Sequence, residues 1–445
     1  MNASPTIVPL SRTGRLTVLF VAFLGWLGAG VHMAITQQTG RAASIDLLGR
    51  TGAIDSDRFA AFSKDKNLSS TDKEQFQAWE VLVGRWFAWN QCSFLFGAAT
   101  GGLLFGWLGD RIGRSKGMCL SILTYSSFSA TVYLAQSPEQ FVALWFLACL
   151  GVGGMWPNGV ALVAEAWSNL SRPVTAGIIG TSANIGIFLL ATLARQVPIT
   201  PDDWRWVMLV GAAPFALGVF ALLVVPESPR WLASRGKQAE SMVVSISTGD
   251  VFRPPLLWIT LIGIVLATTP VLGGWGTANW MTPWSEKAGS PALRADVLQT
   301  RALTGIVGSL LGGWIASRLG RRTTYFLVSL SSLLIAQYVF WSLLPSDNSF
   351  LVWVALLGFV SGIYFGWLPL CLPELFPTCV RSTGAGVSFN FGRIATAVTL
   401  FASGALMGYF EGDYARIGRI TGMFFVLGMV AIWFAPDTSK RQIAD

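Results

Sequence analysis

Charged side chains inside apolar segments are the residues of this sequence most able to do chemistry. Arg393 lies within the apolar run 381–408. A helix that begins at Arg381 rises 1.5 Å per residue, which places Arg393 about 18 Å along it, at mid-bilayer depth. Ionisable groups at that depth are costly and usually functional. We therefore expect Arg393 to hold an anionic substrate or to pair with a carboxylate. A hydrogen bond to a neighbouring helix carbonyl is the structural alternative.

Two asparagines share this predicted depth. Asn390 lies one helical turn before Arg393, so the two side chains are on the same face of their helix. Asn184 occupies the corresponding depth in the run 173–194. Both amides are predicted to contact the same solute as Arg393.

The single histidine of the chain is His32, within the apolar run 14–36. Histidine titrates near neutral pH, so His32 could carry a proton or donate a hydrogen bond to an anion. The alternative is a histidine packed between helices. The residues around it favour neither interpretation.

Other polar and aromatic residues inside apolar runs could line a solute site. Aromatic rings suit the face of a ring compound or a sugar, and amides supply hydrogen bonds. Each of these residues is equally open to a packing or interfacial role. The candidates are Gln91, Trp156, Asn158, Trp275, Asn279, Tyr364 and Trp367.

The composition shows which solvent surrounds these side chains. The 445 residues are 53% hydrophobic and 12% charged, whereas soluble domains carry about 25% charged residues. The chain has 20 tryptophans and 48 glycines, residues typical of membrane interfaces and of closely packed membrane helices. We therefore predict an integral membrane protein.

Apolar runs of about 20 residues, the length that spans a bilayer, recur along the chain. We expect these runs to be helices, because no segment shows the alternation of apolar and polar residues typical of a membrane β-barrel. Twelve spans are predicted, at 14–36, 84–108, 116–135, 139–165, 173–194, 204–225, 256–282, 297–319, 323–344, 350–373, 381–408 and 418–435.

The loop charges predict the orientation. Arginines and lysines gather between alternate runs, which places both termini in the cytoplasm. This arrangement also explains the net charge of +8 without a nucleic acid partner. Residues 39–78 form a long polar loop outside, in which Thr71 and Glu74 have capping-box spacing and predict a helix leading into the second span.

An internal repeat divides the chain. Residues 106–114 read Gly-Trp-Leu-Gly-Asp-Arg-Ile-Gly-Arg, and residues 313–321 read Gly-Trp-Ile-Ala-Ser-Arg-Leu-Gly-Arg. Similar segments around Glu165 and Glu374 follow at a nearly equal offset. A repeat this long predicts two related six-helix halves. They are expected at 1–226 and 254–445, joined by an inside loop at 227–253.

The repeated segments lie at the predicted inner ends of the helices, where pairs of opposite charge can close one side and break when the halves move. Glu165 and Glu374 are the expected carboxylate partners of the arginines. The alternative is that the arginines only hold their loops in the cytoplasm. The gating candidates are Asp110, Arg111, Arg114, Glu165, Arg318, Arg321, Glu374 and Arg381.

Nearly the whole sequence resembles the major facilitator superfamily. The motif at 106–114 carries the resemblance most specifically. The segments Pro-Glu-Ser-Pro-Arg-Trp-Leu at 226–232 and Pro-Glu-Leu-Phe-Pro-Thr at 373–378 resemble the sugar-porter and metabolite–proton symporter branches. The resemblance implies twelve transmembrane helices in two pseudo-symmetric halves, a multi-pass protein of the plasma (inner) membrane, and transport by alternating access.

Several positions depart from the resembling organic-acid symporters. Met155 stands where those proteins carry Glu, and Trp145 stands where many carry Arg. Their two helix 1 acids are replaced by Ala29 and His32. These departures leave both proton symport and facilitated diffusion open.

The sequence therefore predicts a transporter of a small organic solute, an organic anion such as a carboxylate or an acidic sugar, with or without proton symport. A neutral sugar or polyol is the alternative solute, and a transport-inactive sensor is the alternative class. No catalytic cluster, metal-ligand spacing or phosphate-binding loop is present. We therefore expect neither an enzyme nor a cofactor, and a monomer in the lipid bilayer.

Overall fold

The computed structural model describes residues 10–65, 67–167, 172–229, 231–233, 251–376, 381–405 and 409–438. Most of the predicted inside loop 227–253 and the side chain of the gating candidate Arg381 lie outside the described residues. All secondary-structure elements among the described residues are helices, and these residues contain no strand. This confirms the predicted all-α class.

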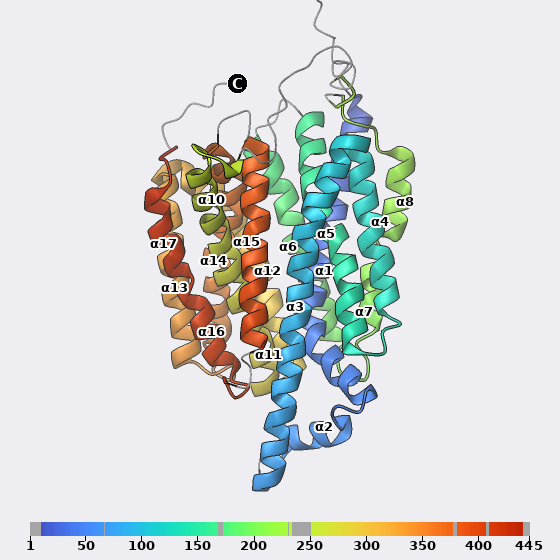
Figure 1. Cartoon of the computed structure of the whole chain (residues 1–445), viewed down its shortest axis with the longest axis vertical. Coiled ribbons are helices and arrows are strands. Elements are labelled where there is room, and N and C mark those ends of the chain that lie inside the picture. The colour runs from blue at the N-terminus through green and yellow to red at the C-terminus, as the bar shows by residue number, and fades with distance from the viewer. Residues whose placement is uncertain are drawn as a thin grey trace, which may run out of the picture.

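The first half of the chain forms one bundle, on the right in Figure 1. The short helix α2 and the adjoining part of α3 project from the bundle at the bottom of the view. The helices are α1 (Arg12–Arg50), α2 (Ser56–Lys64), α3 (Ser70–Ile112), α4 (Arg114–Val132), α5 (Pro138–Ala166), α6 (Arg172–Gln196), α7 (Trp206–Ala212) and α8 (Phe215–Val224).

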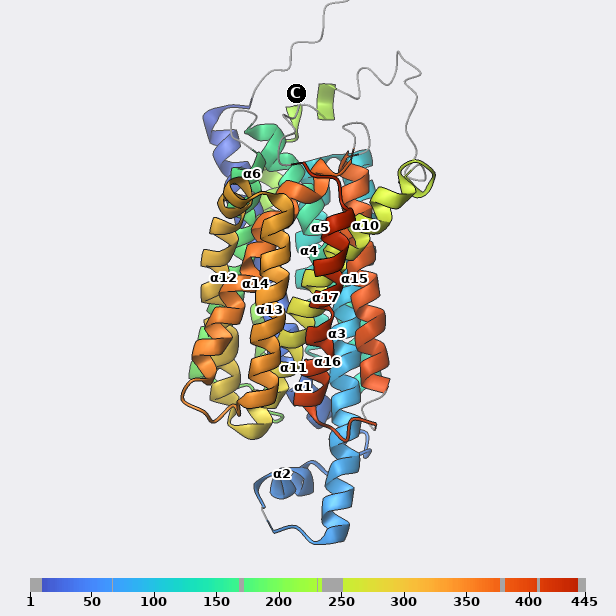
Figure 2. The same cartoon turned by 90° about the vertical axis from the view of Figure 1, so that its left-hand side faces the viewer.

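The second half forms the other bundle, which faces the viewer in Figure 2. Its helices contact the first half mainly where α15 packs on α3 and α12 packs on α6. The elements are α10 (Leu257–Thr269), the π-helical turn η2 (Pro270–Trp275), α11 (Gly276–Ala288), α12 (Pro291–Leu319), α13 (Arg321–Ser342), α14 (Phe350–Glu374), α15 (Arg381–Ala405), α16 (Tyr414–Met423) and α17 (Phe425–Phe434).

Each predicted span coincides with a helix or with consecutive helical pieces. Within the described residues, nine helical segments are long and apolar enough to cross a membrane. The start of α1 and the end of α17 lie at the same end of the molecule, opposite α2 (Figure 1). Following the loop charges, we call the end that carries α2 the outer end and the opposite end the inner end.

The predicted outer loop 39–78 is largely helical. Helix α1 continues to Arg50, and α3 begins at Ser70, so both extend beyond the predicted spans. The cap of α3 is Ser69, whose Oγ accepts a hydrogen bond from the Asp72 amide at 3.2 Å, two residues before the expected cap. The extension of α1 is held by α3, because Asn90 Nδ2 donates to the Gly40 carbonyl and to Ser44 Oγ at 3.3 Å.

The repeated motif has the same backbone geometry in both halves. Gly113 separates α3 from α4 with φ of 118°, and Gly320 separates α12 from α13 with φ of 90°. Side chains rarely adopt positive φ, so glycine is needed at both places. The repeat therefore specifies the same sharp helix–helix turn at the inner end of each half.

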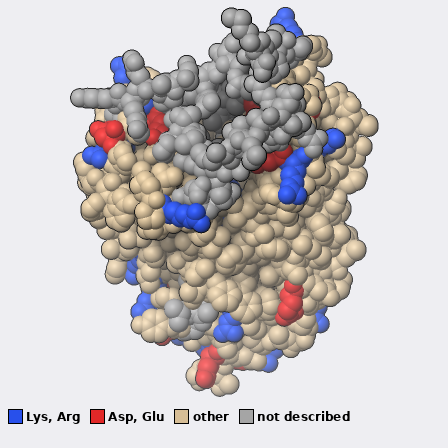
Figure 3. All heavy atoms as spheres, turned by 45° about the horizontal axis from the view of Figure 1, so that its top comes forward, with Lys and Arg blue, Asp and Glu red and all other residues tan. Residues whose placement is uncertain are grey.

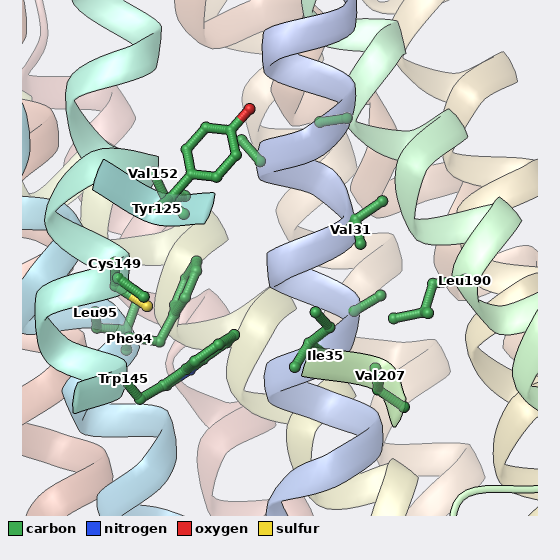
Figure 4. Packing of buried hydrophobic residues seen from close by; sticks show 14 of the residues in the cluster. Val31, Ile35, Phe94, Leu95, Tyr125, Trp145, Cys149, Val152, Leu190 and Val207 are labelled. Carbon is green, nitrogen blue, oxygen red and sulfur yellow. The ribbon is translucent and has the colours of Figure 1, made fainter. Parts of the chain in front are cut away.

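Apolar side chains form two large buried clusters and an exposed belt around the molecule, and the first cluster also includes second-half residues such as Trp280 and Leu400. Figure 4 shows part of the first cluster, where residues of neighbouring helices gather around Val31 and Ile35 of α1. Large apolar residues such as Leu223 and Trp341 are exposed by 81% and 68%. In Figure 3 the charged residues lie toward the two ends, with an uncharged belt between them. Such a belt fits lipid as its solvent.

Candidate functional site

Arg393 of α15 lies at the interface between the two halves. Its Nη1 donates to the Ala98 carbonyl of α3 at 3.4 Å and to Asn390 Oδ1 at 3.5 Å, and its guanidinium lies 4.6 Å from the centre of the Phe389 ring. Both hydrogen bonds are long, and no carboxylate within the described residues forms an ion pair with it. Arg393 and Asn390 therefore lie next to each other, as predicted. Because Arg393 has no carboxylate partner among the described residues, its guanidinium can still bind an anion.

Arg301 of α12 is a second arginine deep in the membrane, and it is not among the residues that the sequence analysis predicts. Its Nε is buried without a hydrogen-bond partner, and no described carboxylate pairs with it. The sequence places it near the outer end of a span that starts at residue 297. Because α12 starts at Pro291, Arg301 lies about 15 Å along the helix instead.

The helical wheel of α12 shows which way Arg301 points. Between Arg301 and Trp314, the exposed large apolar side chains of this helix are Leu303, Val307, Leu310, Leu311 and Trp314. At about 100° per residue, Arg301 lies on the other side, which it shares with Gly305. Asn184 of α6 is adjacent to Gly305. Arg301 is nevertheless partly exposed, on the side of the helix away from Leu303, Val307 and Leu310.

His32 is enclosed by the first half. Its Nδ1 donates to the Gly28 carbonyl at 2.9 Å, and its ring lies 4.8 Å from Tyr125 of α4 and stacks at 5.6 Å on Trp145 of α5. Tyr125 and Trp145 are both labelled in Figure 4. Two positions that depart from the resembling symporters, His32 and Trp145, are therefore in direct contact. These contacts favour the packing alternative for His32.

Three predicted site residues make their hydrogen bonds within their own half, although Asn158 Oδ1 is buried without a partner. Asn158 Nδ2 donates to the carbonyls of Phe105 and Gly154, both at 2.9 Å. The Tyr364 hydroxyl is 2.6 Å from Ser329 Oγ, and Trp367 Nε1 donates to the Arg321 carbonyl at 2.9 Å. Their contacts hold neighbouring helices together.

The remaining candidates retain unused polar atoms or make aromatic contacts, one of which crosses the boundary between the halves. Gln91 donates to the Thr36 carbonyl at 2.9 Å, but its Oε1 is unpaired, and both amide atoms of Asn279 are unpaired. Trp275 of η2 stacks on Phe94 of α3 at 4.9 Å, across the two halves. Trp156 packs against Trp26 with ring centres 4.8 Å apart.

At the inner end of the second half, the gating candidates Arg321 and Glu374 form an ion pair. Arg321 Nε and Nη2 each donate to Glu374 at 3.3 Å. Glu374 is 7% exposed and also accepts a hydrogen bond from Thr438 Oγ1 at 2.8 Å. All three residues belong to the second half.

The inner end of the first half uses different partners. Arg114 pairs with Asp110 at 2.5 Å, while Glu165 accepts a hydrogen bond from the Ser228 hydroxyl. The segment after α8 thus occupies the carboxylate that the repeat would assign to Arg114. It also caps α4, because Glu227 Oε1 accepts from the Ser115 amide at 3.0 Å.

Arg111 and Arg318 occupy equivalent positions in the repeat and make equivalent contacts. The guanidinium of Arg111 lies 4.3 Å from the Trp107 ring, and that of Arg318 lies 5.3 Å from the Trp314 ring. Both tryptophans are more than half exposed. Such pairs fit the inner membrane interface, where amphipathic rings and arginines gather.

A surface groove of about 500 Å³ lies beside the interface of α3 and α15. It is lined by Thr100, Leu103, Leu104, Trp107 and Ile394 and contains no charged side chain. Its leucines are exposed on the apolar belt, so it faces lipid and not the arginines between the halves.

Comparison with known proteins agrees with the architecture. A family model described as Major Facilitator Superfamily matches residues 74–400. The chain is 30% identical to the cis,cis-muconate transport protein of Acinetobacter baylyi, over 77% of this chain and 83% of that protein. It is 29% identical to the inner membrane metabolite transport protein YgcS of Escherichia coli, over 79% and 83%.

A solved structure has a similar fold. It is described as a partially occluded inward open conformation of the xylose transporter XylE from E. coli, and it matches with a TM-score of 0.68 at 19% identity. The match covers 97% of this chain and 100% of that chain.

Proposed function

The chain belongs to the Major Facilitator Superfamily, and on that premise we propose that it transports a small organic anion by alternating access. It is a multi-pass membrane transporter of a small molecule and not an enzyme. The proposed solute is a carboxylate or an acidic sugar. Both halves that would rock around the solute lie in one chain, so the proposed transporting unit is the monomer.

The arginines between the halves carry this proposal. Arg393 and Arg301 lie in α15 and α12, the two helices of the second half that pack most closely against the first. Neither is paired with a carboxylate within the described residues. An unpaired charge at this depth is unfavourable, and a bound carboxylate would relieve it through charge-assisted hydrogen bonds.

Aromatic residues supply the proposed apolar walls. Trp275 with Phe94 offers ring faces at the boundary between the halves, and Trp156 with Trp26 offers ring faces within the first half. Such faces suit a planar unsaturated or aromatic acid. The name of one relative specifies cis,cis-muconate, which supports an acid of this kind as the first solute to test.

A neutral sugar is the second candidate. The free amide atoms of Gln91 and Asn279 could hydrogen-bond hydroxyl groups without any need for charge. The two candidates differ in their dependence on arginine, because only the anion requires Arg393.

The test is uptake into proteoliposomes together with thermal stabilisation of the purified protein by organic acids and by xylose. A ligand at 100 times its Kd stabilises the folded state by about 2.7 kcal/mol. We expect an acid to stabilise the protein and Arg393→Gln to reduce its uptake about 30-fold or more, the effect of truncating one partner of a buried charge pair. Arg393→Lys should retain part of the activity.

Arg416→Gln is the matched control, because Arg416 lies at the outer end of the second half and stacks on Tyr409. It should leave uptake unchanged. Acid uptake that survives Arg393→Gln would refute the anion site. Stabilisation by xylose alone would favour the neutral candidate.

A further inference from the structure

A buried ion pair lies at the outer end of the first half. Arg41 of α1 and Glu80 of α3 form two hydrogen bonds, Nη2 to Oε1 at 2.7 Å and Nη1 to Oε2 at 3.1 Å. Arg41 is 6% exposed and Glu80 is 2% exposed. A buried pair is tolerated only when its geometry is good and its remaining polar groups are satisfied.

The second half supplies the remaining partners of this pair. Arg41 Nη1 donates to the Tyr414 hydroxyl of α16 at 2.9 Å, and Lys287 Nζ of α11 lies 3.9 Å from Glu80 Oε2. The Tyr414 ring lies between the two cations, 5.9 Å from the Arg41 guanidinium and 5.8 Å from Lys287 Nζ. The four residues therefore join four helices across the boundary between the halves.

A second set of outer contacts joins α6 and α12. Arg195 Nε is 2.5 Å from Asp296 Oδ1, and Arg294 Nη2 donates to the Ile199 carbonyl at 2.9 Å. Both boundaries between the halves are thus bonded at the outer end.

The inner end differs. Arg321 with Glu374, Arg114 with Asp110, and Glu165 with Ser228 are all contacts within one half or with the segment that follows it. Between described residues, the polar contacts that cross the boundary lie at the outer end or at mid-membrane depth, as with Arg393 and Ala98. The structure therefore has its outer side closed.

We propose that Arg41, Glu80, Tyr414 and Lys287 form an outer gate, in which the Arg41–Glu80 pair stays within the first half while its contacts to Tyr414 and Lys287 form and break with each transport cycle. At this gate, opening separates one hydrogen bond, from Arg41 to Tyr414, and one long ion pair, between Lys287 and Glu80. The strong pair remains intact, so opening leaves neither Arg41 nor Glu80 without its partner. The gate can therefore open repeatedly at low cost, and it biases the resting protein toward the outer-closed state.

Tyr414→Phe tests the gate, because it removes only the hydroxyl that crosses the boundary. The readout is the rate at which a membrane-impermeant maleimide, added outside, labels Ala295→Cys in the full-length protein. The four described cysteines are buried, and the fifth, Cys379, lies outside the described residues and is replaced by serine. Ala295 is fully buried and lies between the outer cross-boundary residues Arg294 and Asp296. When opening is faster than labelling, the labelling rate is proportional to the population of the outer-open state. The same protein without Ala295→Cys gives the background.

Tyr414→Phe removes a hydrogen bond to a charged group and should raise the labelling rate about tenfold. Lys287→Gln should also raise the labelling rate. Asp72→Asn is the matched control, because the Arg58–Asp72 pair at 3.1 Å lies at the outer end but entirely within the first half. It should leave the rate unchanged.

Labelling rates within twofold of the parent for both Tyr414→Phe and Lys287→Gln would overturn the proposal. A similar increase in Asp72→Asn would also overturn it, because the effect would then reflect general loosening. No substrate is present in the assay, so its outcome is independent of the proposed anion.

Discussion

Replacing Arg301 by methionine is expected to abolish anion transport and yet leave the protein at least as stable as before. The side chain is deep in the membrane, and its Nε is buried without a partner. Removing an unpaired, partly buried charge takes away a desolvation cost and breaks no ion pair within the described residues. Methionine fills a similar elongated volume. We therefore expect the free energy of unfolding to rise by about 1 kcal/mol, which corresponds to an increase of about 2 °C in Tm.

Arg294→Met is the matched control in the same helix. Arg294 is 1% exposed, pairs with Glu286 at 2.8 Å and donates to the Ile199 carbonyl. Breaking a buried pair by removing one partner destabilises a protein by about 3–5 kcal/mol. The two arginines of α12 should therefore give opposite shifts in Tm, although the substitution is the same.

The assay is thermal unfolding of both variants in one detergent without ligand, followed by acid uptake in proteoliposomes. Arg301→Met should not lower the Tm as much as Arg294→Met does. An equal decrease would mean that Arg301 has a partner in the protein and is not free to hold an anion. Normal acid uptake by a stable Arg301→Met protein would show that the arginine does not contact the solute.

Two further predictions concern His32 and the inner end. His32→Gln should lower the Tm, because it removes ring contacts to Tyr125 and Trp145. Solute accumulation driven by a pH gradient should equal that of the parent protein. Loss of this accumulation without a change in Tm would assign proton coupling to His32. Glu374→Gln should weaken the pairing with Arg321 and lower the Tm. The control is Asp110→Asn, a substitution that should change the Tm little because the Asp110 side chain is 63% exposed. Equal decreases in Tm for the two variants would contradict a stabilising role for buried Glu374.

The helices could be predicted because hydrophobicity and repetition are local properties of the sequence. Each span needs about 20 apolar residues, and the repeat places equivalent turns at Gly113 and Gly320. The family assignment follows from the same segments. These features need no knowledge of which helices are neighbours.

The outer gate could not be predicted in this way. Arg41 lies in the polar stretch 39–78 that hydropathy assigns to a loop, and Glu80 lies between that stretch and the second predicted span. Tyr414 is separated from Arg41 by most of the chain. Only the packing of α1, α3, α11 and α16 shows that these side chains meet. Arg301 was not predicted because the expected span starts at residue 297, whereas α12 starts at Pro291. The late predicted start places Arg301 near the membrane surface.

The placement of ion pairs relative to the boundary explains how two tightly packed halves can move. The buried pairs Arg41–Glu80 and Arg321–Glu374 each lie within one half. The ion pair that crosses the boundary at 2.5 Å, Arg195–Asp296, has side chains 52% and 23% exposed, so water can replace either partner at little cost. Rocking therefore separates neutral or hydrated contacts and leaves the buried charges paired. The unpaired arginines between the halves are the exception, and a bound anion would supply the charge that they lack.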